Sequence, residues 1–384
     1  MKKLEKSQVQ TLRTIENITN YKSKYNLYSM AVKFHYDIDN VIKNFTEQNA
    51  VYKAECNDNT KIIEKAMKVA TDVIKKEVNV EISDEIKLTP FGCSAFTLKA
   101  EDKGNGVWMG RNYDFKINTS AMLVYCQPEH GYKSVGFAAL SNVGVINPML
   151  DNENQKQVLC APFICLDGTN EKGVSIAVLV VDGEPTCQYD SDKPDIFTSL
   201  AIRLVLDRAA TTEEAVKLLK KYNMIAIGGK DYHFYISDVN GDGRVVEYNY
   251  KNTDIREVMV TPASVVTNFY VFDEEHYGHG YDRYITIHKV LDKAEAAKGH
   301  PDTDKKKLKK ELKDFAWDAL RGSSQAPIEG DPTSNTQWSV LFDNTAGQVE
   351  IIFRRNWDDK HEYSLRELEK KYFPRHKRET VKEV

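Results

Sequence analysis

Residues 91–115, FGCSAFTLKAEDKGNGVWMGRNYDF, bring a thiol, a guanidinium and a carboxylate into one short stretch. Cys93 opens a strand-like run, and EDKGNG at 101–106 is typical of a tight hairpin turn. The return strand carries Arg111 and Asp114, so the hairpin places both near Cys93. A thiolate is the reactive form of cysteine, and a nearby cation lowers the thiol pKa. The spacing therefore makes Cys93 a candidate nucleophile.

A nucleophilic Cys93 needs a base, and no histidine stands within reach of it in the sequence. The α-amine of a chain-terminal residue can serve, since its pKa is about 7.7–8.0. This base exists only if the chain is cut between Gly92 and Cys93, which makes residues 1–92 a prosegment. Gly92 suits a cleavage site because glycine lets the backbone bend closely. On spacing alone, a buried structural Cys93 beside a surface salt bridge in RNYD stays open.

The elements around this hairpin differ between the two parts of the chain. Before residue 90 the pattern is charged and mainly helical, and 59–78 predicts an amphipathic helix with Asn59 as its N-cap. After residue 90, strands are predicted at 94–100, 107–112, 121–126, 134–140, 174–181, 232–237, 244–250, 256–261, 338–343 and 349–354. Further helices are predicted at 194–208, 212–222, 282–297 and 303–321.

Antiparallel strands with helices gathered in blocks indicate a layered α+β domain. No Pro- or Ser-rich linker divides residues 93–357. We therefore expect a mainly helical prosegment at 1–92, one catalytic domain at 93–358, and a charged helix or tail at 359–384.

The bulk composition excludes several classes of function. The chain has 384 residues, 41% of them hydrophobic, and a formal net charge of -4, which does not favour nucleic-acid binding. Its six cysteines form no CxxC pair, so zinc or redox chemistry has no support. No apolar run approaches the roughly 20 residues of a membrane span. No signal peptide is apparent, and we expect a cytoplasmic protein.

Several motifs, taken in order, resemble the choloylglycine hydrolase family of linear amide C–N hydrolases, whose nucleophile is an N-terminal cysteine. They are Cys93 after Gly92, GRNYDF at 110–115, DGTNEKGVSIAV at 167–178, VVTNF at 265–269 and YDRY at 281–284. The family includes bile salt hydrolases and penicillin V acylases, and acid ceramidase-like amidases share its fold. The resemblance covers roughly residues 91–357. It implies a four-layer αββα sandwich, the N-terminal-nucleophile hydrolase fold, preceded by a helical prosegment.

The resemblance also implies a role for each matched position. Cys93 is implied as the nucleophile with its own α-amine as base, and Arg111 and Asp114 as the residues that hold thiol and amine. Asn268 is implied as a donor to the oxyanion, and Arg283 as a second arginine that supports the site electrostatically. The implied substrate is a small N-acyl amide. Neither a metal nor an organic cofactor is implied.

One position departs from the family pattern. Bile salt hydrolases carry a second asparagine ten residues after that of NEKG, and here this position is Val180. Either a backbone group replaces the amide, or Asp182 takes part after a local shift. The long prosegment is more typical of the ceramidase and N-acyl amidase branch.

Alternatives to this function stay open at the level of sequence. They are a bile acid hydrolase or penicillin V acylase proper, acyl transfer through the same acyl-enzyme, and an uncleaved binding scaffold. A homo-oligomer is also open. The segment EHYGHG at 275–280 is read as a lid or pocket rim rather than as a metal half-site, and Trp338 as a core residue or a support below the site.

Overall fold

Two β-sheets form the centre of the computed structural model, which describes residues 3–55, 58–80, 91–100, 106–150, 153–252, 255–298, 304–327 and 335–374. The first has nine strands in the order β1 (Glu16–Asn17), β2 (Leu27–Ala31), β5 (Ala121–Cys126), β6 (Ser134–Ala139), β7 (Cys165–Asn170), β8 (Ser175–Val181), β11 (Asp231–Ser237), β12 (Gly243–Tyr248) and β13 (Val258–Pro262). The second has six, in the order β14 (Val265–Val266), β3 (Phe91–Lys99), β4 (Val107–Phe115), β17 (Thr336–Asp343), β18 (Gln348–Phe353) and β19 (Lys360–Ser364).

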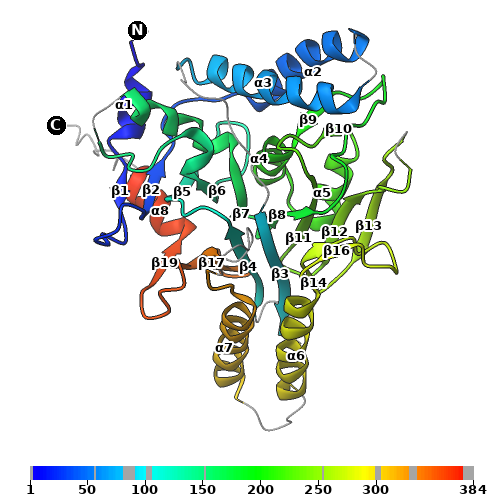
Figure 1. The fold of residues 1–384 in the computed structure, drawn as a ribbon. Coiled ribbons are helices and arrows are strands. Elements are labelled where there is room, and N and C mark those ends of the chain that lie inside the picture. The colour runs from blue at the N-terminus through cyan, green and yellow to red at the C-terminus, as the bar shows by residue number, and fades with distance from the viewer. Residues whose placement is uncertain are drawn as a thin grey trace, which may run out of the picture.

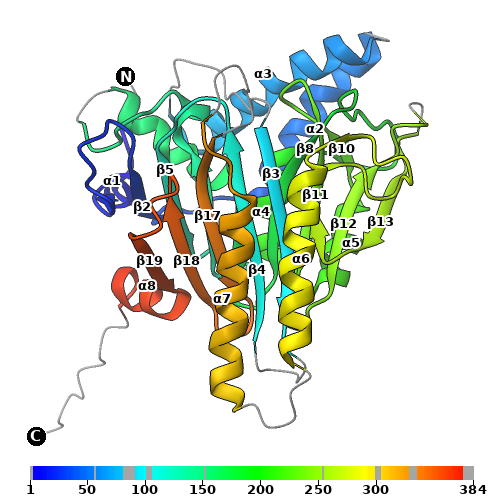
Figure 2. The ribbon, with the colours of Figure 1, turned by 60° about the horizontal axis from the view of Figure 1, so that its bottom comes forward.

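Helices cover the outer face of each sheet, as Figures 1 and 2 show. On the nine-stranded sheet these are α4 (Thr198–Arg208) and α5 (Thr212–Leu219). On the six-stranded sheet they are α6 (Tyr281–Lys298) and α7 (Lys305–Ser323), which pack against β3, β4 and each other. The layers therefore run helix, sheet, sheet, helix, and the expected α+β four-layer αββα fold is confirmed.

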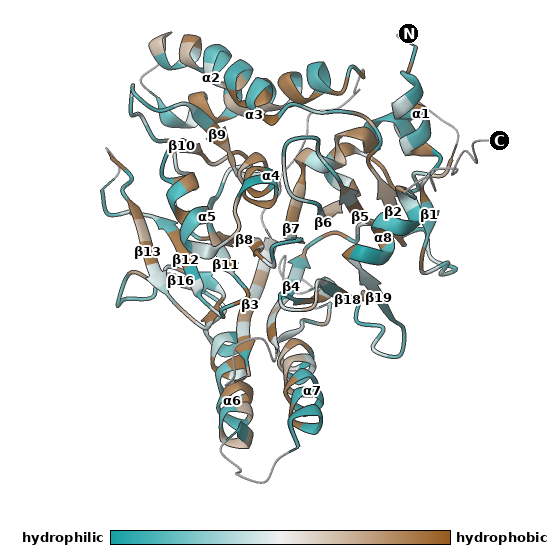
Figure 3. Cartoon of the chain, turned by 180° about the vertical axis from the view of Figure 1, so that it is seen from behind, coloured by the Kyte–Doolittle hydropathy of each residue, from teal (hydrophilic) through white to brown (hydrophobic). Residues whose placement is uncertain are grey.

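The central strands are buried on both faces, which explains their nearly continuous apolar sequences. Every residue of β4, β8 and β17 is buried. One face of each strand meets the opposite sheet and the other meets helices, so the alternation of half-exposed strands is lost. Figure 3 shows hydrophobic and hydrophilic residues interleaved along α6 and α7, as helices with one buried side require.

The segment before Cys93 contains helices α1 (Lys6–Leu12), α2 (Ile38–Glu55) and α3 (Asn59–Glu77). The predicted helix at 59–78 is confirmed as α3, but the cap is wrong by one residue. The side chain of Asp58 accepts hydrogen bonds from the backbone amides of Thr60 and Lys61. The buried stripe of α3 comprises Ile62, Ile63, Ala66, Val69, Ala70, Thr71, Val73 and Ile74.

Strand β2 joins this N-terminal segment to the body of the protein. It pairs in parallel with β5, from Leu27 beside Ala121 to Ala31 beside Tyr125. All five residues of β2 are buried. The sequence pattern did not predict this strand, because its short apolar run is framed by charged, helix-like segments. Residues before Cys93 thus complete a sheet of the main domain.

The remaining elements are short or peripheral. They are the 3-10 helices η1 (Leu140–Val143) and η2 (Glu153–Phe163), strands β9 (Asp195–Phe197), β10 (Asn223–Ile225), β15 (Asn268–Phe269) and β16 (Gly278–His279), and helix α8 (Leu365–Tyr372). Within the predicted tail, β19 and α8 pack at the sheet edge, and residues 375–384 lie outside the described part of the chain. In the described ranges, no helix is both long and apolar enough to cross a membrane.

Candidate active site

The β3–β4 hairpin brings Cys93, Arg111 and Asp114 together, as the sequence predicts. Its register places Cys93 opposite Tyr113 and Gly92 opposite Asp114. Residues 101–105 of the predicted turn lie outside the described residues. Cys93, Arg111 and Asp114 are all fully buried, so the pair in RNYD is not a surface salt bridge. Gly92 and Cys93 are consecutive residues of one continuous strand.

Asn268 connects Cys93 to the opposite sheet. Its side-chain oxygen accepts a hydrogen bond from the backbone nitrogen of Cys93 at 2.9 Å. Its side-chain nitrogen donates to the carbonyl oxygen of Val180 on β8 at 2.7 Å. A donor on one side and an acceptor on the other fix the orientation of the amide. Asn268 therefore bridges β3 and β8 within the buried interior.

Arg283 ties three of the predicted site residues to one another from the first turn of α6. Its Nη1 donates to the carbonyl oxygen of Cys93 at 2.6 Å and to Asp114 Oδ2 at 3.1 Å. Its Nη2 donates to Asn268 Oδ1 at 2.6 Å. Gly280 leaves room for this guanidinium, since a Cβ there would lie 2.6 Å from Nη2. Gly280 also has a φ of +87°, a conformation that favours glycine.

Two groups of the nine-stranded sheet hold the Arg111 guanidinium. Its Nε lies 2.7 Å from Asp167 Oδ2, and its Nη2 donates to the carbonyl oxygen of Val178 at 2.9 Å. Asp167 also accepts a hydrogen bond of 3.0 Å from the indole nitrogen of Trp338. Trp338 thus supports the site as well as the core.

The sequence pattern did not predict Asp167 as a site residue, although Asp167 is the first residue of the motif DGTNEKG. The usable signal was chemical: a buried guanidinium requires a buried acid, because an unpaired internal charge is costly. The buried carboxylate of Asp114 also requires partners. In addition to the contact with Arg283, its Oδ1 accepts a hydrogen bond from the hydroxyl of Thr336 at 2.5 Å. Burial raises the pKa of the Asp114 carboxyl, and the charge of Arg283 opposes that shift.

The Cys93 thiol is fully buried, and burial favours its protonated form. Burial raises its pKa to about 12, and the positive charge of Arg111 counteracts this while the charge of Asp114 adds to it. A hydrogen bond to the backbone of Asp114 and the charge of Arg283 also lower the pKa. Cationic side chains are therefore in place beside the sulfur, and burial outweighs them.

Val180 occupies the position at which the family pattern has its second asparagine. The side chain of Val180 is apolar and buried, and its carbonyl oxygen receives the amide of Asn268. Asp182 instead lies 3.3 Å from Lys230 Nζ and 2.9 Å from His279 Nδ1. The Val180 carbonyl is an acceptor for Asn268, so what replaces the amide of the second asparagine stays a prediction.

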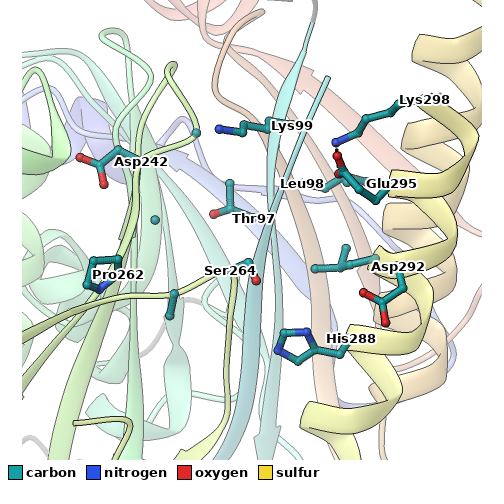
Figure 4. Close-up of a pocket in the computed structure, with 14 residues that line it drawn as sticks. Thr97, Leu98, Lys99, Asp242, Pro262, Ser264, His288, Asp292, Glu295 and Lys298 are labelled. Carbon is teal, nitrogen blue, oxygen red and sulfur yellow. Dashed lines mark hydrogen bonds and ion pairs between the residues drawn. The ribbon is translucent and has the colours of Figure 1, made fainter. Parts of the chain in front are cut away.

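Two pockets differ in their relation to this site. Figure 4 shows a pocket of about 520 Å³ at the far end of β3, lined by Thr97, Lys99, His288 and further residues of α6, with none of the five predicted site residues in its wall. A second, of about 610 Å³, is lined by Asp182, Gly183, Glu184, Lys230, Tyr250, Arg256, Tyr277 and Gly278. None of the five predicted site residues lines this pocket either, but two of its lining residues neighbour the site in the fold. Asp182 directly follows β8, and Gly278 pairs with Phe269, the residue after Asn268. The segment EHYGHG contributes to the rim of this second pocket. In the described ranges, no group of three or more potential metal ligands occurs.

Comparison with known proteins identifies the family to which this geometry corresponds. Residues 93–299, more than half of the 384-residue chain, match the linear amide C-N hydrolases, choloylglycine hydrolase family. This chain belongs to that family. The match begins at Cys93, so the choloylglycine hydrolase region starts at the predicted nucleophile.

Individual relatives within the choloylglycine hydrolase family are distant. A penicillin V acylase from Pectobacterium atrosepticum is 32% identical over 121 residues, which are 28% of this chain and 31% of that acylase. A variant of the conjugated bile acid hydrolase from Clostridium perfringens superposes with a TM-score of 0.51 at 15% identity, over 72% of this chain and 93% of that one. Penicillin V acylase from Agrobacterium tumefaciens gives a TM-score of 0.49 at 20% identity, over 68% and 83% of the two chains. At 15% identity, the bile acid hydrolase structure establishes the fold alone.

Proposed function

We propose that this protein hydrolyses a linear amide bond in a small N-acyl compound, with Cys93 as nucleophile, after cutting its own chain between Gly92 and Cys93. The hydrogen bond from the Cys93 nitrogen to Asn268 Oδ1 carries this proposal. In the proposed cleavage this nitrogen is the leaving group, and in the cleaved chain it is the base. Asn268 Oδ1, at 2.9 Å, can accept a hydrogen bond from the nitrogen both as an amide before cleavage and as an amine after it.

The self-cleavage step begins with attack of the Cys93 sulfur on the carbonyl carbon of Gly92. A C–S bond forms, the C–N bond to Cys93 breaks, and the thiol proton passes to the departing nitrogen. The α-amine of Cys93 is then free, and water hydrolyses the Gly92 thioester, which releases the Gly92 carboxylate and restores the Cys93 thiol. Arg283 holds the Cys93 carbonyl oxygen at 2.6 Å, so the residue stays fixed while its amide bond is replaced.

Turnover repeats the same chemistry on an external amide. The α-amine takes the thiol proton, the sulfur attacks the substrate carbonyl, and the leaving amine receives the proton. The second hydrogen on Asn268 Nδ2 is the donor that we assign to the developing oxyanion, and Arg283 keeps the Asn268 side chain oriented. Arg111 stabilises the thiolate, while Asp114 anchors Arg283.

The pocket beside Asn268 is the proposed substrate site. Its size, about 610 Å³, suits a small organic molecule. Arg256 in its wall is only 4% exposed, and its Nη1 has no hydrogen-bond partner among the described residues, with Asp231 at 3.7 Å. Such a guanidinium fits a carboxylate or carbonyl on the amine portion of the substrate.

Intact mass and denaturing electrophoresis test the proposal directly. Fragments 1–92 and 93–384 are expected from the wild type, together with release of amine from N-acyl amino acids or ethanolamines, bile salt conjugates or penicillin V. Cys93→Ala is expected to abolish both. Cys160→Ala removes another fully buried thiol outside the site and is the matched control. Cleavage or turnover that survives Cys93→Ala overturns the proposal, and a chain that stays intact and inactive supports the scaffold alternative.

A further inference from the structure

His233 and Glu247 form a fully buried pair that none of the steps above uses. Nδ1 of His233 lies 2.9 Å from Oε1 of Glu247, and neither side chain has any exposed surface. The two residues lie on neighbouring strands, β11 and β12. Buried charged groups are costly, so a pair retained in the interior calls for a structural or chemical reason.

Both members of the pair contact the backbone that flanks Asn268. Nε2 of His233 lies 2.8 Å from the carbonyl oxygen of Thr267, the residue directly before Asn268. The two carboxylate oxygens of Glu247 accept hydrogen bonds from the backbone amides of Val271 and Phe272, both at 2.8 Å. The pair therefore fixes the chain on both sides of Asn268.

This stretch of chain has little regular structure of its own to hold it. Strand β14 pairs with β3 in the six-stranded sheet, and the chain then leaves that sheet at Thr267. The following strand, β15, has two residues and pairs with the two-residue β16. Two residue pairs are a weak ladder. The position of Asn268 between Cys93 and Val180 thus needs support from the side chains of β11 and β12.

The contacts leave no ring nitrogen of His233 without an oxygen neighbour. Nδ1 faces the Glu247 carboxylate and Nε2 faces the Thr267 carbonyl. The backbone amides of Val271 and Phe272 complete the shell of Glu247.

We propose that His233 and Glu247 are positioning residues that hold Asn268 between Cys93 and Val180 for self-cleavage and turnover. The inference rests on the proposed function, in which Asn268 orients the Cys93 nitrogen and donates to the oxyanion. It assigns no contact with substrate to either residue. Their effect is transmitted through the backbone at Thr267, Val271 and Phe272.

The test replaces both members at once by His233→Phe with Glu247→Leu. Apolar replacement of a whole buried pair commonly preserves stability, whereas removal of one partner leaves an unpaired charge. We expect a folded protein whose thermal unfolding is close to wild type, with kcat reduced about 100-fold, as for loss of an oxyanion donor, and KM little changed. A folded double variant with wild-type kcat overturns the proposal.

A matched control removes a second fully buried pair, Arg203 and Asp207 of α4, whose charged atoms lie 2.7 Å apart. Arg203→Met with Asp207→Leu is expected to keep wild-type kcat. Equal losses in both double variants would show a general effect of removing buried pairs and contradict the positioning role. If the first double variant does not fold, the single Glu247→Gln variant, which keeps the side-chain size, is expected to lower kcat without changing KM.

Amide hydrogen exchange separates this inference from the proposed function. Exchange at Val271 and Phe272 is expected to accelerate in the His233/Glu247 variant and to stay unchanged in the Arg203/Asp207 variant. This readout applies to a Cys93→Ala chain, which needs no activity. A wild type that hydrolyses no amide contradicts the proposed function, whereas unchanged exchange at Val271 and Phe272 contradicts the positioning role of His233 and Glu247.

Discussion

The side-chain oxygen of Asn268 lies 2.9 Å from the backbone nitrogen of Cys93, although 175 residues separate the two in sequence. This contact aligns the nitrogen of the Gly92–Cys93 bond with a fixed acceptor. The same amide reaches the carbonyl of Val180 on the other sheet. The geometry on which the proposed chemistry depends is thus set by one side chain that spans two sheets.

Substitution of Asn268 by aspartate is expected to reduce kcat by about 10²–10³, the usual cost of losing an oxyanion donor. Aspartate keeps the size and the acceptor for the Cys93 nitrogen, but it has no N–H for Val180 or for the oxyanion. Steady-state kinetics on the cleaved protein measure the effect. Wild-type kcat in Asn268→Asp would remove Asn268 from the mechanism.

Replacement of Arg283 by methionine is expected to lower the free energy of unfolding by about 3–5 kcal/mol, because it leaves the buried carboxylate of Asp114 without its cation. Adding Asp114→Asn is expected to restore part of this loss, since it removes the orphan charge. Urea titrations of both variants in a Cys93→Ala background measure the two values. A double variant no more stable than Arg283→Met would contradict the pairing argument.

Asp167 provides a prediction about pH. Burial raises the pKa of its carboxyl from 3.8 to about 6, against the opposing effects of Arg111 and Trp338. The folded state therefore binds this proton more tightly than the unfolded state, and ionisation of Asp167 costs stability as pH rises from about 4 to about 6. The Asp167→Asn variant has no carboxyl to ionise and avoids this loss of stability. Both proteins are compared in a Cys93→Ala background. The unfolding free energy of Asp167→Asn minus that of the protein with Asp167 is expected to rise by about 1.4 kcal/mol per pH unit in this range. A pH-independent difference would refute the assignment.

The cut chain is expected to stay together. Strand β2 is buried inside the nine-stranded sheet, so loss of residues 1–92 would expose the edge of β5 and its apolar neighbours. Fragments 1–92 and 93–384 are expected to co-elute in native size-exclusion chromatography and to separate only in denaturant. Leu27→Ala with Met30→Ala, at two fully buried positions, is expected to weaken the association. Separate elution of the wild-type fragments without denaturant would contradict this prediction.

Arg256 is expected to select the amine portion of the substrate. Arg256→Met should raise KM for N-acyl amino acids about tenfold, the effect of one lost hydrogen bond to a charged group, and should change KM for N-acylethanolamines much less. Lys221→Met, an exposed cation outside the pocket, is the control. An equal change for both substrate classes would show that Arg256 does not recognise the carboxylate.

The sequence determined the local part of the site. Cys93, Arg111 and Asp114 lie on one hairpin, and hairpin pairing follows from turn position and strand pattern. The α+β class and most strands of the two sheets were predictable for the same reason. Strand β2 and Asp167 were not, because neither has a distinctive local pattern and both gain their meaning from residues far along the chain.

Only the tertiary structure decided how the distant residues act. Contacts between Asn268 and Cys93, Asn268 and Val180, and Arg111 and Val178 join residues 175, 88 and 67 positions apart. The stacking of two sheets brings these groups within hydrogen-bond distance, and burial favours hydrogen bonds between them because it removes them from water. Sequence motifs predicted Cys93 and Asn268 as site residues. The packing of β3 against β8 brings the two together, and the side-chain amide of Asn268 connects them.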